Sequence, residues 1–181
     1  MSARATPGLA DSAPCPCGAT GEAGRRGAPG RPLSLAACCG RWLMPEPAQQ
    51  PEPADPGVAP TPEALMRSRY TAFVLDRRAH LLATWHPDHR PAAIEPPEPG
   101  LQWLGLQVQG SAVHPLGAGQ AVPAWAQGLS GSPMSAWGEV RFVARYKLGG
   151  RAHRLVEHSV FACQDGRWTY VHAMPAVIDG A

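Results

Sequence analysis

The chain has 181 residues and a formal net charge of +2 at pH 7, which suits one ordinary domain with a smaller attachment. So small a charge does not imply nucleic-acid binding, and no run of about 18 apolar residues predicts a membrane span. The first residues lack the apolar block of a secretory signal, so we expect a soluble, cytoplasmic protein.

Four of the five cysteines form two pairs near the start of the chain, and twenty residues separate the pairs. Each pair is followed by a glycine, and Pro16 bends the first pair, so both pairs suit turns. Zinc binds four thiolates in a tetrahedron and can take two from each of two turns. A redox disulfide pair or free thiols in a disordered tail are the alternatives, but stable disulfides are rare in the cytoplasm. Residues 1–44 therefore predict a knuckle with a structural zinc ion on Cys15, Cys17, Cys38 and Cys39.

Residues 45–61 predict a linker, because seven of the eighteen residues from Pro45 to Pro62 are proline. An extended proline-rich spacer of this length reaches up to roughly 55 Å. The segment could thus hold the knuckle away from the rest of the chain, or could itself drape over the domain surface.

Two helices should follow the linker. Thr61 suits an N-cap and Pro62 suits the first helical position, so we expect a helix from there to Val74. Asp76 could cap a second, shorter helix that ends before Pro87, with Leu82 and Trp85 facing the core.

The remaining residues are predicted to form strands and one long loop. Leu104, Leu106 and Val108 alternate with polar or small residues, as in a half-buried strand. Residues Gly117 to Ala136 read as a surface insertion, although Trp125 and Trp137 suggest that parts of it pack down. Cys163 falls in a strand pattern and should be a core residue.

The last third predicts an antiparallel meander with two-residue turns at Gly149-Gly150 and Asp165-Gly166. These turns pair Val140 with Ser159, Ser159 with His172, Gly138 with Phe161 and Phe161 with Tyr170. One face of the sheet should then lie under the helices, which gives an α+β domain over residues 62–174 and a short tail, 175–181. That face carries Val140, Phe142, Ala144, Tyr146, Leu155, Glu157, Ser159, Phe161, Trp168, Tyr170 and His172.

Glu157 would be a carboxylate in an apolar setting, where an unpaired charge is costly. One reading pairs it with Arg67 or Arg69 of the first helix, as an anchor between helix and sheet. The other places it in a ligand cavity, with His172 as a possible acid/base partner. Ser159 and Tyr170 would lie beside this pair, and Tyr70 and Trp85 would form apolar walls.

His86 and His89 could suggest a second metal site. Two histidines just beyond a helix end are more often solvated side chains, and no carboxylate or cysteine elsewhere is tied to them.

Several motifs resemble known families. Cys-Pro-Cys-Gly followed by Cys-Cys-Gly resembles the SEC-C zinc motif, named for the C-terminal tail of the SecA translocase motor. Downstream, LMRSRYTAFV, LLATWHP, FVARY and EHSVF ahead of DGRWTYV resemble the YchJ-like bacterial proteins of unknown function. The resemblance implies a SEC-C motif joined to a cone-shaped domain like nuclear transport factor two, with helices packed on a curved antiparallel sheet.

Two functions follow from this reading. The leading hypothesis is an accessory protein whose zinc motif docks a protein partner, which the SEC-C resemblance places in the export, chaperone or ribosome-associated sphere. The alternative is an enzyme or small-ligand binder that uses the cone cavity around Glu157 and His172. An open cavity with an unpaired Glu157 would favour the alternative, and a closed core with an arginine on Glu157 would favour docking.

Overall fold

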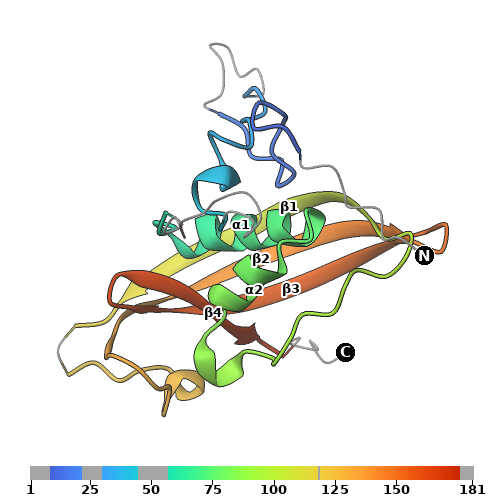
Figure 1. Ribbon diagram of the computed structural model, residues 1–181. Coiled ribbons are helices and arrows are strands. Elements are labelled where there is room, and N and C mark those ends of the chain that lie inside the picture. Colours follow the sequence, from blue (N-terminus) through green and yellow to red (C-terminus); the bar gives the residue numbers. More distant parts are fainter. Residues whose placement is uncertain (1–8, 22–29, 45–56, 118, 176–181) are drawn as a thin grey trace, which may run out of the picture.

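The computed structural model describes residues 9–21, 30–44, 57–117 and 119–175. In that part of the chain the helices are α1 (Pro62–Val74) and α2 (Arg78–Ala83), and the strands are β1 (Gln102–Pro115), β2 (Met134–Leu148), β3 (Arg151–Gln164) and β4 (Arg167–Ala173). Short 3-10 turns lie at Cys39–Arg41 (η1), Pro87–His89 (η2) and Ala124–Ala126 (η3). The strands form one antiparallel sheet in the order β1-β2-β3-β4, and both helices lie against one of its faces (Figure 1). The α+β architecture expected from the sequence is confirmed.

Helix α1 begins as predicted, because the Thr61 hydroxyl accepts a hydrogen bond from the backbone N–H of Ala64 at 3.1 Å. The start of α2 differs from the prediction. Asp76 has a left-handed backbone angle, φ 52°, so Arg77 and not Asp76 precedes the helix. Leu81 is the buried leucine of α2, and Leu82 is only half-buried.

The end of α2 is set by β4. Backbone N–H groups join the two segments, from Tyr170 to Thr84 O at 2.9 Å and from His86 to Tyr170 O at 2.7 Å. Trp85 therefore lies on a short parallel bridge to Tyr170, beyond the end of the helix. This pairing fixes Trp85 against the sheet.

Both predicted hairpin turns are present. Gly149 and Gly150 have φ of 56° and 80°, and Asp165 and Gly166 have φ of 50° and 73°, as a two-residue turn with this twist requires. The predicted pairs Val140–Ser159, Gly138–Phe161 and Phe161–Tyr170 are confirmed.

The predicted pairing of Ser159 with His172 is wrong. A bulge between Val160 and Phe161 shifts the register, so His172 lies opposite Val160 and Ser159 opposite Ala173. The extra residue, Val171, is fully buried.

Strand β1 is longer than predicted and carries two bulges, one between Trp103 and Gly105 and one between Val108 and Gly110. The first bulge breaks the expected alternation. Leu104 is 55% exposed, whereas Trp103 packs against the core.

Part of the second face of the sheet is covered by the segment that leads into β2. There Trp125, Leu129 and Met134 pack against a cluster of Val160, Ala162 and Val171. The sequence-predicted surface loop thus packs down, as Trp125 suggested. Cys163 is buried in the core, as expected.

The cysteine-containing segment packs directly on the domain. Cys15, Cys17 and Cys39 belong to the same buried cluster as Leu65 and Met66 of α1. In Figure 1 the blue segment lies above α1, beside the edge strand β1. Of the two possibilities for the linker, this contact does not fit a spacer that holds the knuckle away from the domain. Most of the predicted linker, residues 45–56, lies outside the described residues.

Candidate functional site

The two cysteine pairs are brought together by a short antiparallel ladder. Cys15 N–H donates to Leu33 O at 2.8 Å, and Leu35 N–H donates to Ala13 O at 2.8 Å. Gly18 then turns the chain with a φ of 68°. The ladder sets the two turns face to face, which is how distant cysteine pairs meet.

The four sulfur atoms all lie within 4.8 Å of one another. The separations are 3.5 Å for Cys15–Cys17, 3.6 Å for Cys17–Cys38 and 3.9 Å for Cys38–Cys39. Four thiolates bound about 2.3 Å from one ion stand about 3.8 Å apart. The sulfur spacing is therefore close to that of a four-thiolate metal site, and the cluster could hold a metal ion.

The thiols compete for protons within this cluster. Hydrogen bonding to Cys17 lowers the pKa of Cys15, whereas burial raises the pKa of Cys38 to about 12. Hydrogen bonding to Cys15 raises the pKa of Cys39. A divalent cation removes this competition, because it binds the thiolate form of each cysteine.

Helix α1 supplies polar contacts to the cluster. Arg67 Nη1 donates to Cys17 O at 3.2 Å while Arg67 Nε pairs with Glu63 at 2.8 Å, and the Thr71 hydroxyl lies 3.8 Å from Cys15 Sγ. The prediction that Arg67 could anchor Glu157 is wrong. Two residues along a helix turn about 200°, so Arg67 and Arg69 face opposite sides of α1.

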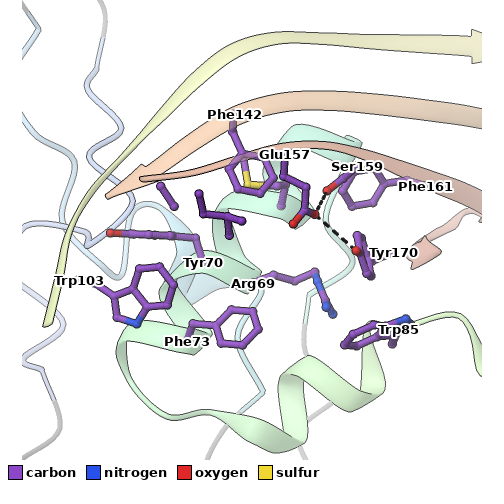
Figure 2. A pocket seen from close by; sticks show the side chains of 13 residues that line it. Arg69, Tyr70, Phe73, Trp85, Trp103, Phe142, Glu157, Ser159, Phe161 and Tyr170 are labelled. Atoms are coloured by element: carbon purple, nitrogen blue, oxygen red, sulfur yellow. Dashed lines mark hydrogen bonds between the residues drawn. The ribbon is translucent and has the colours of Figure 1, made fainter. Parts of the chain in front are cut away.

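A cavity of about 290 Å³ lies between α1 and the sheet on the side of the helix that carries Arg69. Its walls are mainly apolar, and Figure 2 shows Glu157 reaching into it from β3. The apolar lining consists of Met66, Tyr70, Phe73, Trp85, Trp103, Phe142, Ala144, Leu155 and Phe161. The polar lining consists of Arg69, Glu157, Ser159 and Tyr170.

Glu157 Oε1 accepts hydrogen bonds from the Ser159 hydroxyl at 2.6 Å and the Tyr170 hydroxyl at 3.4 Å. Neither Arg67 nor Arg69 forms an ion pair with this carboxylate. Burial, and secondly the charge of Glu157, raise the pKa of Tyr170. Burial likewise raises the pKa of Tyr70 to about 12, so both phenols stay protonated at neutral pH.

Arg69 is held by neutral groups. Its Nη1 donates to Leu81 O and to the Thr84 hydroxyl, both at 2.8 Å, and its guanidinium lies 4.9 Å and 4.6 Å from the ring centroids of Trp85 and Tyr170. Burial lowers the pKa of Arg69 to about 10, which leaves it charged at pH 7.

The sequence analysis predicted that His172 lies in this cavity, and this prediction is wrong. The β4 bulge turns its ring toward Trp125 and His89, at centroid distances of 5.9 Å and 5.6 Å. His172 does not line the cavity, so it has no contact with Glu157 there. The sequence also missed Trp103, because the bulge that turns this ring inward leaves no periodic signal.

In the described residues the cysteines form the one cluster of three or more possible metal ligands, and His86 and His89 do not belong to it. His86 is fully buried, contrary to the expectation of a solvated side chain, and its Nε2 contacts Gln164 Oε1 at 3.1 Å. His89 is exposed.

A model of the middle, NTF2-like domain of YchJ matches residues 61–122 and 129–173. The chain belongs to the YchJ family. Its YchJ relatives include a UPF0225 protein of Methylibium petroleiphilum, 48% identical over 158 residues that cover 87% of this chain and 85% of the relative. A UPF0225 protein of Chromobacterium violaceum is 41% identical over 166 residues, 91% of this chain and 94% of the relative.

Two solved structures are similar to this YchJ family member. The solution structure of a SEC-C motif containing protein from Rhodopseudomonas palustris has a TM-score of 0.54 and 26% identity, and covers 81% of this chain and 94% of its own. The crystal structure of a SEC-C motif containing protein from Psychrobacter arcticus has a TM-score of 0.53 and 22% identity, with 93% and 84% covered. The expected YchJ-like family and NTF2-like fold are confirmed. No helix in the described part of the chain is long and apolar enough to span a membrane.

Proposed function

We propose that this protein binds a small, mainly apolar molecule in the cavity between α1 and the sheet. The observation that carries the proposal is a cavity of about 290 Å³ into which Glu157 reaches without a direct ion pair to Arg69, the buried cation on the α1 wall. Ligand sites combine apolar walls with a few polar groups that fix orientation, and this cavity has that composition. Of the two functions considered from the sequence, this geometry favours the ligand binder.

The second element of the proposal is a structural zinc ion on Cys15, Cys17, Cys38 and Cys39. Four protein thiolates leave no open coordination position, so zinc bound there supplies stability and no chemistry. The reducing cytoplasm suits such a site, because thiols stay reduced there.

The two sites share helix α1. Arg67 and Thr71 contact the cysteine loop, while Arg69 and Tyr70 line the cavity on the other side. Zinc would thus fix the position of the helix that forms one cavity wall.

Zinc binding is tested by metal analysis of the purified chain. We expect about one equivalent of zinc, and Cys38→Ser should lose it. A metal-free protein with four reduced thiols would contradict the proposal. Because the cysteines share the core cluster of α1, we also expect a lower melting temperature in the variant.

Ligand binding is tested by filling the cavity. Ala144 is 1% exposed and lines the cavity, so Ala144→Leu should occupy part of it. Arg145→Leu adds the same side chain at the neighbouring, exposed position and is the matched control. In ligand-observed NMR with a panel of small aromatic compounds, we expect hits that weaken at least about tenfold in Ala144→Leu only. Hits that are unchanged in Ala144→Leu, or an absence of hits, would refute the proposal.

A second candidate is docking of a protein partner through the knuckle, from the export, chaperone or ribosome-associated sphere. The exposed side chains of Leu9, Arg31 and Arg41 favour it, since they give the knuckle a mixed apolar and basic surface. Affinity capture with the whole chain and with Arg31→Glu/Arg41→Glu tests it. A partner retained equally by both would not dock through this surface.

A further inference from the structure

The cavity offers one free hydrogen-bond acceptor. Both hydrogen bonds to Glu157, from Ser159 and Tyr170, reach Oε1, and none within the described residues reaches Oε2. An ionised carboxylate only accepts hydrogen bonds. A ligand group placed against Oε2 must therefore donate a hydrogen bond.

The charges in the cavity already balance. Arg69, 6% exposed, carries the positive charge on the α1 wall, and Glu157 carries the negative charge on the β3 wall. A charged ligand would add an unbalanced charge to a mainly apolar space, which costs free energy. An uncharged ligand would not.

The size and shape of the cavity bound the ligand further. A volume of about 290 Å³ is at the lower limit of roughly 300 Å³ for sites of drug-sized molecules, so one ring with a short chain fits. Tyr70 packs edge-on against Trp103, with ring centroids 5.4 Å apart, so the walls suit an aromatic ring.

We propose that the ligand is an uncharged, ring-sized molecule whose hydroxyl or N–H group donates to Oε2 of Glu157. This inference rests on the proposed function, and it names the ligand class for the same cavity.

The experiment compares four probes with the same ring: 2-phenylethanol, ethylbenzene, phenethylamine and 3-phenylpropionate. Each is titrated into the ¹⁵N-labelled whole chain, and affinity is read from amide chemical shifts. We expect 2-phenylethanol to bind about tenfold more tightly than ethylbenzene, as a hydrogen bond to a charged group contributes. The amine and the carboxylate should bind more weakly than the alcohol.

Two variants test whether Glu157 causes the preference for the alcohol over the hydrocarbon. In Glu157→Leu, the alcohol should lose its advantage over ethylbenzene, while Glu157→Gln, which keeps an acceptor oxygen, should retain part of it. Glu139→Gln is the control, because Glu139 pairs with His158 at 2.6 Å and does not line the cavity.

The outcomes separate the two levels of the proposal. Equal binding of alcohol and hydrocarbon, or an advantage that survives Glu157→Leu, would overturn the ligand class and leave the cavity as a ligand site. Tighter binding of the amine or the carboxylate would overturn the requirement for an uncharged ligand. If none of the four probes shifts the amides around the cavity, both the ligand class and the proposed function fail.

Discussion

Mild acid should destabilise this protein through His80 of α2, which is 1% exposed. Its Nδ1 accepts a hydrogen bond from Met44 N–H at 3.3 Å, so the neutral ring carries its proton on Nε2, 3.1 Å from the Ser68 hydroxyl. Burial, and secondly the charge of Arg69, lower the pKa of His80 from 6.5 to about 4. Protonation at Nδ1 would break the contact that joins α2 to the end of the knuckle.

The sign and size of the effect follow from that pKa. Between about pH 6.5 and pH 4 the unfolded chain binds a proton at His80 that the folded chain does not. The contribution of His80 to stability is therefore complete above about pH 6.5 and is lost as the pH falls toward 4. The depression corresponds to about 3 kcal/mol over the full range.

Urea unfolding of the wild type and His80→Gln at about pH 7 and about pH 4.5 measures this contribution. We expect the wild type to lose about 2 to 3 kcal/mol more than the variant on acidification. Release of metal from the cysteines affects both proteins and cancels in the difference. An equal loss in the two proteins would refute a neutral, buried His80.

Two further predictions concern the packing of α1. A Cβ on Gly138 would lie 2.5 Å from Cγ of Pro62, so Gly138→Ala should lower the free energy of unfolding by about 1–3 kcal/mol in the same urea assay. Gly110→Ala is the control, because its Cβ meets nothing within 4 Å. Equal effects of the two substitutions would contradict the contact between Gly138 and Pro62. Arg69→Met should cost about 2–4 kcal/mol, because it removes a buried charged donor from Leu81 O and from the half-buried Thr84 hydroxyl. Arg67→Met, at a partly solvated ion pair, should cost less than about 1 kcal/mol, and the reverse order would show that the two arginines are wrongly assigned.

Features specified by neighbouring residues could be predicted from the sequence. Thr61 with Pro62 fixes the start of α1, and the Asp165-Gly166 turn fixes the hairpin around it, because each depends on local backbone chemistry. The clustering of the four cysteines could also be predicted, because their residue types and spacing suit one tetrahedral ion.

Features that depend on bulges were not predictable. One extra residue, Val171, moves His172 from the expected cavity to the opposite cluster, and a bulge after Trp103 brings this ring into the cavity wall. A bulge leaves the alternation of residue types almost unchanged, so only the paired strand reveals it. Which of Arg67 and Arg69 faces the cavity likewise depends on the position of α1 between the knuckle and the sheet, which the sequence does not reveal.

The central claim is that the space between α1 and the sheet holds a ligand, and nuclear Overhauser effects between bound 2-phenylethanol and the protein test it most directly. We predict contacts from the phenyl ring to Tyr70, Phe73 and Trp103. Contacts only to Trp125 and Leu129 on the opposite face, or none to the protein, would contradict it.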